Sequence, residues 1–584
     1  MHLRLVGIFL CLPLLTEAAR PRPELLTTAE QSGFHRTGRY DEVERLCAVL
    51  ARTYPDRVRC TTLGPTPEGR PLRALIASAD GSFAPRPDRP AVVVQGGIHA
   101  GEIDGKDAGF QVLRELLEGS LLPGQDILRR LTLVFVPVFN VDGHERYGAH
   151  NRPNQNGPEE MGWRTTAQNL NLNRDYMKAE APEMAAMLKL LGEWDPVVYV
   201  DLHVTDGADF QPDVAVLIEP GQAGPDMLAE TAREIRAALG PQLAAKGHLP
   251  LTEFYPSFVK PDDPAGGFAV GFLPPRFSTS YWALRNRLGV LVETHSWKDY
   301  ATRVRATHDT MAEVLRVAAE RGGAWRQAET AADALPLGSA PVVLAWETAP
   351  TSHMIEFRGY AYRREPSPIS GQLRIVYDRS RPEIWRVPLY DQLRPTLTVT
   401  APRGGYLVPA AWAARVREKL ALHGVTFQTL ESAGMREVEV FRATEVSHRK
   451  DSFEGRVPTT VRGAWARERR SVPAGSLFVP VAQPRGRLAV HLLEPQAPDS
   501  LCSWGYFDAA FEQKEYMEDY VAEAVAEDLL RRDPALKAAF LQKLATEPEF
   551  ARDPRRRLEF FARRHPSWDE RLNLYPVYRV EAAP

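Results

Sequence analysis

Apolar runs alternate with amphipathic stretches between about residue 40 and residue 322. The apolar runs that resemble buried strands are Ala91–Gln95, Leu131–Val138, Val197–Leu202 and Val290–Val292. Apolar positions recur at helical spacing in the segments between them, as in Gln111–Leu117 and Met184–Leu191. Strands that alternate with helices predict an α/β layer in which much of the sheet is parallel.

The pattern changes after the helix-like stretch Met311–Glu320. The later segments are a connector at Leu335–Pro341, strands within Val342–Val399, a helix at Ala410–His423, more strands within Glu437–Leu493, and mostly helix in Phe511–Arg564. This region contains no metal-ligand cluster, nucleophile elbow or glycine-rich phosphate loop in its sequence. We therefore predict two parts, residues 19–334 and an α+β region of unknown role at residues 335–584.

The N-terminus has the pattern of a signal peptide. Met1–Arg4 is short and basic, Leu5–Leu15 is apolar, and small residues precede a cleavage position after Ala18. A buried N-terminal helix is the alternative. The apolar run is shorter than the roughly 20 residues that a membrane span requires, and no later run is long enough. We expect residues 1–18 to be removed and the protein to be secreted or periplasmic.

Composition excludes several classes of protein. Of the 584 residues, 44% are hydrophobic and 25% charged, a balance typical of globular proteins rather than of disordered ones. Lys and Arg total 72 against 75 Asp and Glu, giving a net charge of −3. A chain this close to neutral lacks the excess of basic residues that binding to nucleic-acid phosphates requires. We expect neither a nucleic-acid partner nor a membrane span, and the sequence does not indicate an oligomeric state.

Four cysteines are too few for a disulfide-rich scaffold. Helical spacing in Tyr40–Thr53 directs Cys47 toward the core, and strand alternation in Arg57–Thr62 directs Cys60 inward as well. The sequence leaves open whether these two residues form a disulfide or remain as two buried thiols, and we favour the thiols.

A histidine followed three residues later by a glutamate can hold a zinc ion where the backbone turns. This spacing occurs at His99–Glu102, His353–Glu356 and His491–Glu494. The second and third pairs lie in strand-like runs, where side chains three residues apart point to opposite faces. His99 instead follows a strand and a Gly-Gly turn, and Glu102 stands where a helix opens. We predict that His99 and Glu102 bind the metal.

The other candidates stand at the ends of strand-like runs, where open α/β sheets form their sites. His203 ends the run at residues 197–202 and is the candidate third ligand, although a lone histidine here could simply satisfy the sheet edge. Two histidines and one glutamate leave a fourth position open, which is typical of hydrolytic zinc sites. Glu293 ends another strand and is a candidate proton shuttle. Asp206 and Asp209 are better explained as solvated loop carboxylates.

Six motifs follow one another in an order that resembles the zinc carboxypeptidases. They are His99-Ala100-Gly101-Glu102, Asn140-Val141-Asp142-Gly143, Trp163-Arg164, Asn171-Leu172-Asn173-Arg174, Asp201-Leu202-His203 and Val292-Glu293. The resemblance covers roughly residues 40–308. It implies a mixed, largely parallel eight-stranded sheet flanked by helices. It also implies one zinc ion bound by His99, Glu102 and His203, with Glu293 as general base and then acid.

The same resemblance assigns the residues that contact substrate. Arg164 would stabilise the oxyanion, and Asn173 and Arg174 would hold the free C-terminal carboxylate of a peptide. Tyr281 is a candidate for the substrate-side tyrosine of the family, although it stands closer to Glu293 than usual and a core aromatic is the alternative. Many relatives carry aspartate where Asn171 stands, and an asparagine there can still accept a hydrogen bond from the first histidine ligand.

The resemblance implies a metallocarboxypeptidase that hydrolyses the C-terminal bond of peptides. A zinc-dependent deacylase or amidase acting on a small N-acyl amino acid or a cell-wall peptide is the alternative. A non-catalytic binding protein with the same fold is a third possibility, which the complete set of ligands together with Glu293 disfavours. The sequence leaves the preferred side chain open, because residues 266–286, where we place the specificity pocket, contain no clear motif.

Overall fold

The structure is a computed structural model that describes residues 22–221 and 224–584. The predicted signal peptide at residues 1–18 lies outside the described residues. Among the described residues, no helix combines the length and the apolar character needed to cross a membrane.

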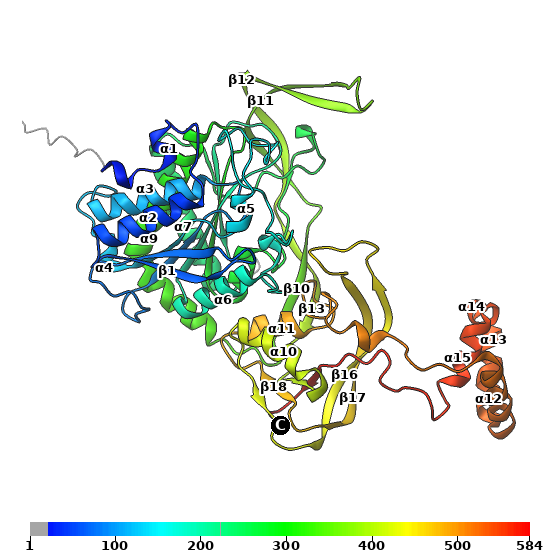
Figure 1. Cartoon of the computed structure of the whole chain (residues 1–584). Coiled ribbons are helices and arrows are strands. Elements are labelled where there is room, and N and C mark those ends of the chain that lie inside the picture. Colours follow the sequence, from blue (N-terminus) through cyan, green and yellow to red (C-terminus); the bar gives the residue numbers. More distant parts are fainter. Residues whose placement is uncertain (1–21, 222–223) are drawn as a thin grey trace, which may run out of the picture.

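An eight-stranded sheet forms the centre of the first part (Figure 1). Its strands are β1 (Val58–Pro65), β2 (Pro71–Ala77), β3 (Ala91–Gln95), β4 (Thr132–Val136), β5 (Val198–Val204), β6 (Val214–Glu219), β7 (Pro250–Leu251) and β9 (Leu288–Thr294). Their order is β1-β2-β4-β3-β5-β9-β6-β7. The central pairs β4–β3, β3–β5 and β5–β9 are parallel, whereas β1–β2, β2–β4 and β6–β9 are antiparallel. This confirms the predicted mixed sheet.

Helices flank this sheet. They are α1 (Thr28–Gln31), α2 (Tyr40–Thr53), α3 (Asp104–Glu118), α4 (Ile127–Arg130), α5 (Val141–Glu145), α6 (Pro182–Trp194), α7 (Asp226–Ala245), α8 (Ser278–Leu284) and α9 (Tyr300–Asp333). Helix α3 ends at Gly119, whose φ of 74° places it in the left-handed region that glycine adopts without strain. The carboxylate of Asp299 caps the start of α9 by accepting a hydrogen bond from the Thr302 backbone N–H. Helix α9 packs against both α3 and α7.

Cys47 in α2 and Cys60 in β1 form a disulfide, with their Cα atoms 5.4 Å apart. The alternative of two buried thiols, which the sequence analysis favoured, is therefore wrong. Inward orientation of both residues was predictable from local periodicity. Their pairing depends on the packing of α2 against β1, which the sequence pattern does not specify. Cys502 is buried and unpaired.

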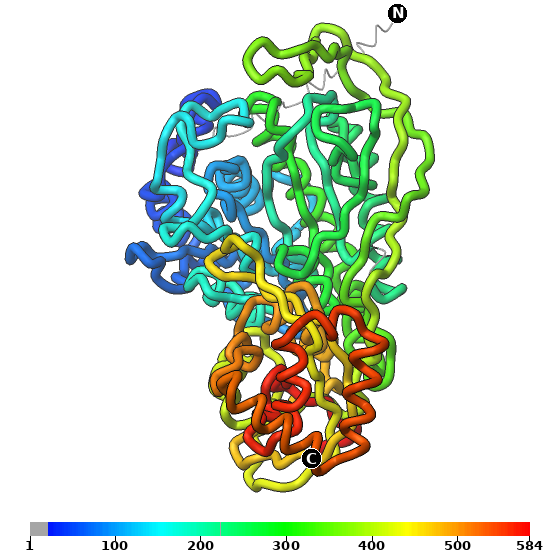
Figure 2. The backbone as a smooth tube through the Cα atoms, turned by 90° about the vertical axis from the view of Figure 1, so that its right-hand side faces the viewer, coloured from blue at the N-terminus to red at the C-terminus, as the bar shows by residue number. Residues whose placement is uncertain are grey.

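The second part adds three smaller sheets. Its strands are β10 (Pro341–Thr348), β11 (His353–Pro366), β12 (Leu373–Tyr390), β13 (Leu393–Thr400), β14 (Gly405–Val408), β15 (Gln428–Thr429), β16 (Gly434–His448), β17 (Thr459–Val472), β18 (Leu477–Pro480) and β19 (Tyr578–Val580). The β16–β17 hairpin belongs to a six-stranded sheet of order β15-β18-β14-β19-β16-β17. Figure 2 shows this hairpin, in yellow, reaching from the second part toward the first.

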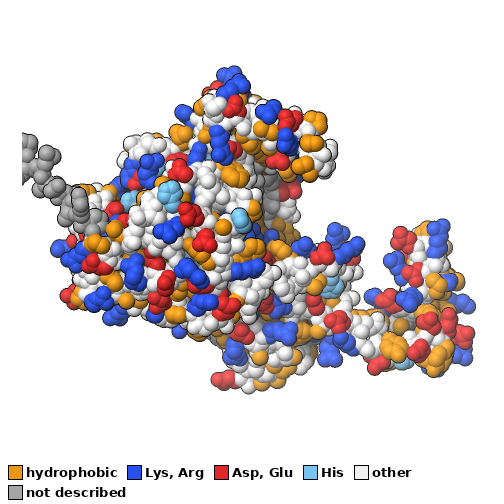
Figure 3. Space-filling view, turned by 45° about the horizontal axis from the view of Figure 1, so that its top comes forward, with side chains coloured by type: hydrophobic (Ala, Val, Ile, Leu, Met, Phe, Trp, Pro, Cys, Tyr) orange, Lys and Arg blue, Asp and Glu red, His pale blue; other side chains and the backbone are white. Residues whose placement is uncertain are grey.

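The helices of the second part are α10 (Ala410–Leu422), α11 (Gly486–Leu493), α12 (Asp519–Arg532), α13 (Pro534–Thr546), α14 (Pro548–Arg552) and α15 (Pro554–Ala562). The predicted extended conformation at residues 487–494 is wrong, because most of this segment is helix α11. Its apolar residues are buried on nearly all sides, and such a run cannot be distinguished from a buried strand by periodicity. Helices α12 to α15 project away from the rest of the chain (Figures 1 and 3), and charges of both signs are interspersed over the face in Figure 3.

The two parts share a sheet and a core. Strand β8 (Phe268–Ala269), from the first part, pairs in parallel with the end of β12, where Leu389 faces Phe268. One hydrophobic cluster runs from Leu25 to Val577. A second cluster joins Phe210 and Phe254 of the first part to Phe357 and Trp385 of the second. The packing is therefore continuous across the predicted boundary near residue 335.

Candidate active site

Three side chains that can hold a metal ion converge at the carboxyl ends of the central strands. One ligand atom from each of His99, Glu102 and His203 lies within 4.8 Å of the others, and all three residues are buried. His99 Nδ1 lies 3.0 Å from Glu102 Oε1, and His203 Nδ1 lies 2.9 Å from Glu102 Oε2. Among the described residues, this is the one such group.

Local backbone geometry brings the first two residues together. The chain leaves β3 through Gly96 and Gly97 before it enters α3. A Cβ on Gly96 would lie 2.8 Å from the Pro137 carbonyl oxygen, and Gly97 has a φ of 61°. Only glycine fits both requirements without strain. A turn closed by the Glu102 backbone N–H, which donates to the His99 carbonyl, then directs both side chains to one point.

The outer nitrogens of both histidines are held by polar side chains. His99 Nε2 lies 3.1 Å from Asn171 Oδ1, so Asn171 occupies the orienting position that the sequence indicated. His203 Nε2 lies 2.9 Å from Asp201 Oδ2. Asp201 accepts further hydrogen bonds from the Gln95 side chain and from the Ser278 hydroxyl. Such partners fix the orientation of imidazole ligands.

The donor set fits zinc. Two imidazoles and one carboxylate, with outer nitrogens held and inner nitrogens directed at one region, match a three-ligand site that keeps a fourth position open. Burial by itself would raise the pKa of Glu102, but His99 and Arg152 lower it well below its usual value. The carboxylate is therefore in its ionised, ligating form. His99, Glu102 and His203 are the residues that would hold the ion.

Glu293 lies directly beside the metal-capable group. It is the β9 residue that pairs with His203 of β5 in the parallel ladder. Burial raises the pKa of Glu293 to about 8, and the nearby His203 opposes that rise. Its Oε2 has no hydrogen-bond partner among the described residues. A carboxylate with a raised pKa and an open oxygen is suited to accept and return a proton near neutral pH.

Two arginines and an asparagine occupy the other side of the site. Arg164 Nη1 lies 3.4 Å from Glu102 Oε1, and its side chain is 34% exposed. Arg174 donates to the Asn173 carbonyl at 2.6 Å, and its guanidinium stacks 3.9 Å from the centre of the Phe277 ring. Burial, together with the nearby Arg164 and Arg276, lowers the pKa of Arg174 to about 10. Among the described residues, no carboxylate lies within ion-pair distance of Arg174.

One cavity of about 890 Å³ connects these groups. It is lined by His99, Glu102, Arg164, Asn173, Arg174, His203 and Glu293. Residues 269–273 and Phe277 lie in its wall, within the segment where the sequence analysis placed the specificity pocket. Leu389 and Leu393 of the second part also line it. The cavity is therefore built by both parts of the chain.

Tyr281 is not in this cavity, so the expectation that it contacts substrate is corrected. It is fully buried in α8, and its hydroxyl lies 2.9 Å from His423 Nδ1. The tyrosine that does line the cavity is Tyr255, in the loop after β7. Burial raises the pKa of Tyr255 well above its usual value, and Glu293 and Asp206 add to the rise. No local pattern distinguishes Tyr255, because only the path of the loop brings it to the site.

Arg152 is a further residue that the sequence analysis missed. It is buried, and its Nη2 lies 2.8 Å from Glu102 Oε1 and 3.3 Å from Asp206 Oδ1. Asp206 lines the cavity and is half exposed, as expected for a loop carboxylate, whereas Asp209 is mostly buried and pairs with Arg379. The position of Arg152 in a loop without regular spacing gave no signal.

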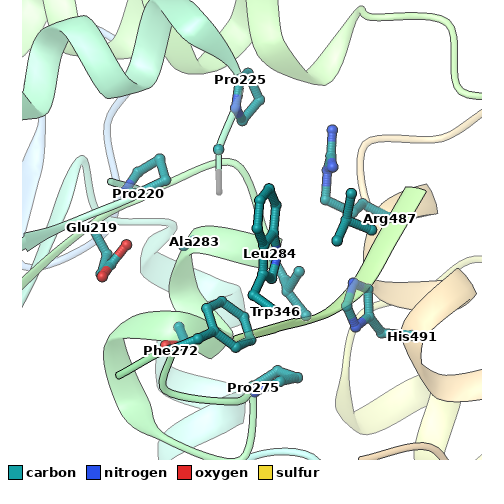
Figure 4. A pocket seen from close by; sticks show the side chains of 13 residues that line it. Glu219, Pro220, Pro225, Phe272, Pro275, Ala283, Leu284, Trp346, Arg487 and His491 are labelled. Atoms are coloured by element: carbon teal, nitrogen blue, oxygen red, sulfur yellow. The ribbon is translucent and has the colours of Figure 1, made fainter. Parts of the chain in front are cut away.

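The other histidine–glutamate pairs do not join the site. His353 and Glu356 lie in β11, and both side chains are exposed. His491 is in α11, where it lines a small pocket of about 40 Å³ with Arg487 and Trp346 (Figure 4). Glu494 instead holds Arg579 through two hydrogen bonds. The expectation that neither pair chelates agrees with the geometry, although the reason given for His491 was wrong.

One family model matches a segment of the first part of the chain. Residues 43–210 match the family model described as zinc carboxypeptidase. This part of the chain is similar to the zinc carboxypeptidases. The matched range of the zinc carboxypeptidase model includes all three metal-capable residues, Arg164, Asn173 and Arg174, and it ends before Glu293.

Curated relatives match over a limited part of this chain. It is 36% identical over 109 residues to "Carboxypeptidase 2" of Trichophyton tonsurans, which is 19% of this chain and 20% of that protein. It is 34% identical over 122 residues to "Inactive metallocarboxypeptidase ECM14" of Saccharomyces cerevisiae, which is 20% of this chain and 28% of that protein. The chain thus spans about a fifth of the length of the first relatives that it matches.

Solved structures give a weaker match. The carboxypeptidase A of Helicoverpa armigera aligns with 51% of this chain and 75% of its own, at 17% identity and a TM-score of 0.36. A metallo-carboxypeptidase of Burkholderia cenocepacia aligns with 47% of this chain and 68% of its own, at 18% identity and a TM-score of 0.35.

Proposed function

We propose that this protein is a zinc-dependent carboxypeptidase that hydrolyses the C-terminal bond of peptides. The observation that carries the proposal is the cavity itself. It brings the metal-capable group, Glu293 and Arg174 together, and Arg174 has no carboxylate partner among the described residues. A partly buried cation that makes no ion pair with a protein carboxylate is matched to a ligand that brings its own carboxylate.

Zinc, when bound by His99, Glu102 and His203, would polarise the scissile carbonyl and acidify a water. Glu293 accepts the proton of the attacking water and passes it to the leaving amine, which its raised pKa favours. Arg164, which lines the cavity beside Glu102, would donate hydrogen bonds to the oxygen that becomes negative. No covalent intermediate with a protein side chain is required.

Arg174 and Asn173 hold the end of the substrate. The guanidinium offers two parallel donors, which match the two oxygens of a carboxylate. The contact with the Phe277 ring restrains the guanidinium before substrate arrives. Only a substrate with a free C-terminus supplies the missing negative charge, so the pair selects a terminal bond over an internal one.

The name of the yeast relative shows that similarity in this family does not by itself establish activity. The proposal of an active enzyme therefore rests on residues of this chain, above all on Glu293 and its position beside His203. The alternative is a zinc-dependent amidase that acts on N-acyl amino acids or other small amides. The experiment below distinguishes it from a carboxypeptidase.

The test compares kcat/KM for a peptide and for its C-terminal amide, in the parent and in Arg174→Ala. The peptide is first chosen by mass-spectrometric screening of a mixed library. We expect the parent to prefer the free acid and Arg174→Ala to lose about 2–5 kcal/mol of transition-state binding for that acid alone. Arg233→Ala, which removes an exposed arginine from the same cavity, should retain the preference. Equal parent rates on acid and amide would favour the amidase.

We further propose that the protein is exported, as its N-terminal pattern predicts. The disulfide between Cys47 and Cys60 supports this, because such bonds persist in oxidising compartments. N-terminal sequencing of protein recovered outside the cytoplasm should begin at Ala19, and an intact Met1 there would contradict cleavage.

A further inference from the structure

The turn that carries the proposed carboxylate-binding residues is held from outside by the second part of the chain. This turn, which we call the carboxylate turn, consists of Asn171 and the short 3-10 helix Leu172–Arg174. Glu454, at the tip of the β16–β17 hairpin, accepts a hydrogen bond of 2.8 Å from the Asn171 backbone N–H. The two residues are separated by 283 positions in the sequence.

The same hairpin tip is fixed to the segment that follows the turn. Arg456 donates a hydrogen bond of 2.6 Å from Nε to Glu180 Oε1. Tyr506 donates to the same carboxylate oxygen at 3.0 Å. Lys419 and His423 of the second part contact the carbonyl oxygens of Ala179 and Met177, at 2.9 Å and 3.0 Å. The tip therefore has a fixed position relative to the carboxylate turn.

Glu454 is unfavourable for the local conformation that it adopts. Phe453 and Arg456 exchange two backbone hydrogen bonds, so Glu454 and Gly455 are the central residues of a two-residue hairpin turn. Their φ angles are 51° and 78°, which is the geometry of a type I′ turn. That turn favours Asn-Gly or Asp-Gly, and a glutamate with positive φ is strained. Strain at one residue in an ordered turn suggests a contact that offsets it.

Glu454 contacts Asn171, the residue that links the metal-capable group to the carboxylate turn. Asn171 Oδ1 lies 3.1 Å from His99 Nε2 and also accepts a hydrogen bond from the Asn173 backbone N–H at 2.9 Å. A shift of Asn171 would therefore move a metal-capable histidine and the carboxylate turn together. The Glu454 carboxylate fixes the backbone of Asn171 through this hydrogen bond.

We propose that Glu454 is a positioning residue that sets the carboxylate turn for binding the C-terminus of the substrate. The second part of the chain is then a component of substrate recognition rather than an appended unit. This inference rests on the proposed carboxypeptidase function. Glu454 acts through Asn171 and does not itself contact the substrate.

Two substitutions separate positioning from a structural role. Glu454→Asn gives the turn its preferred Asn-Gly sequence and shortens the side chain, so the hydrogen bond to Asn171 is lost while the hairpin is favoured. Glu454→Gln keeps the length and an acceptor oxygen. Glu437→Asn is the matched control, because Glu437 is an exposed residue of the same hairpin whose one ion pair among the described residues is with Arg469 across the strands.

We expect Glu454→Asn to lower kcat/KM for a peptide acid by about tenfold to a hundredfold, because small misplacements of binding groups have effects of this size. Its Tm should equal or exceed that of the parent. The loss should be smaller for the C-terminal amide, which makes no ion pair with Arg174. Glu454→Gln should restore most of the activity, and Glu437→Asn should behave as the parent.

A binding measurement makes the result independent of turnover. In a Glu293→Gln background, calorimetry with the same peptide acid should show weaker binding when Glu454→Asn is added. Parent-like binding and kinetics in Glu454→Asn would overturn the inference, and so would a loss that is equal for acid and amide. A parent that hydrolyses neither substrate would instead contradict the proposed function, so the two failures are distinguishable.

Discussion

At the scale of single residues, the site depends on environments that alter ordinary side chains. The same carboxyl group is ionised in Glu102, among two histidines and two arginines, and has a raised pKa in Glu293, a short distance along the sheet edge. One is thereby suited to bind a cation and the other to exchange a proton. This division of roles arises from position, because both residues are glutamates at the ends of strands or turns.

Replacing Glu293 by glutamine tests its role. Glu293→Gln keeps the shape of the side chain and all three metal-capable residues, but it removes the proton acceptor. We expect turnover to fall by about a hundredfold to ten-thousandfold. Elemental analysis should show that zinc remains near one ion per chain. Glu253→Gln, at an exposed position of the same cavity, is the control and should stay active. Turnover near that of the parent would exclude Glu293 as the base.

At the scale of elements, a histidine joins the residue before β6 to helix α9. His248 Nδ1 lies 2.7 Å from Asp213 Oδ2, and its Nε2 lies 3.0 Å from Asp309 Oδ2. Hydrogen bonds to these two carboxylates raise the pKa of His248 to about 9. His308 and Lys246 also face Asp309. Burial by itself would lower the pKa of His308, but hydrogen bonds to Asp309 and Glu115 raise it to about 9.

This arrangement predicts how stability depends on pH. The folded-state pKa of His248 lies above the unfolded value of about 6.5, so its contribution is fully present below pH 6.5 and is lost as the pH rises to about 9. We expect the free energy of unfolding to fall over that range. Denaturant unfolding of His248→Gln should show a fall that is smaller by about 1–3 kcal/mol.

The exposed His353 provides the control for this experiment, because its side chain is 56% exposed in β11. His353→Gln should leave the pH profile unchanged. A His248→Gln profile parallel to that of the parent would show that His248 does not set the dependence.

At the scale of the whole molecule, the two parts of the chain are packed together. They share one hydrophobic cluster, the β8–β12 pairing and the aromatic cluster around Phe268. The second part also supplies cavity wall and the contact with the carboxylate turn. We infer that the first part is not an independent folding unit, although its sequence alone contains the motifs of the family.

Truncation tests this inference. A chain that ends at residue 334 would expose apolar side chains that Phe357 and Trp385 now cover. We expect it to aggregate or to unfold at a much lower temperature than the full chain, measured by light scattering and thermal melting. A chain that lacks only residues 519–562, joined by a short linker, should stay folded, because these helices have a small separate core. A soluble, active 19–334 fragment would contradict the dependence.

The sequence by itself indicated most residues of the candidate site. Buried strands appear as continuous apolar runs, and the chain emerges at their carboxyl ends, so His203 and Glu293 could be placed at one edge of a sheet. The glycine turn before His99 was equally predictable from the sequence, because a positive φ and a close backbone approach require glycine. These are local rules, and each depends on a few neighbouring residues.

Only the tertiary structure decided which residues that are distant in the sequence come into contact. In the structure, Tyr255 rather than Tyr281 lines the cavity, and Cys47 is bonded to Cys60. Residues 486–493 form a helix, and Glu454 contacts Asn171. None of these follows from periodicity, because the partners lie on different elements and their meeting depends on how those elements pack. The local pattern determines which way a side chain points, whereas the packing of distant elements determines which residues it contacts.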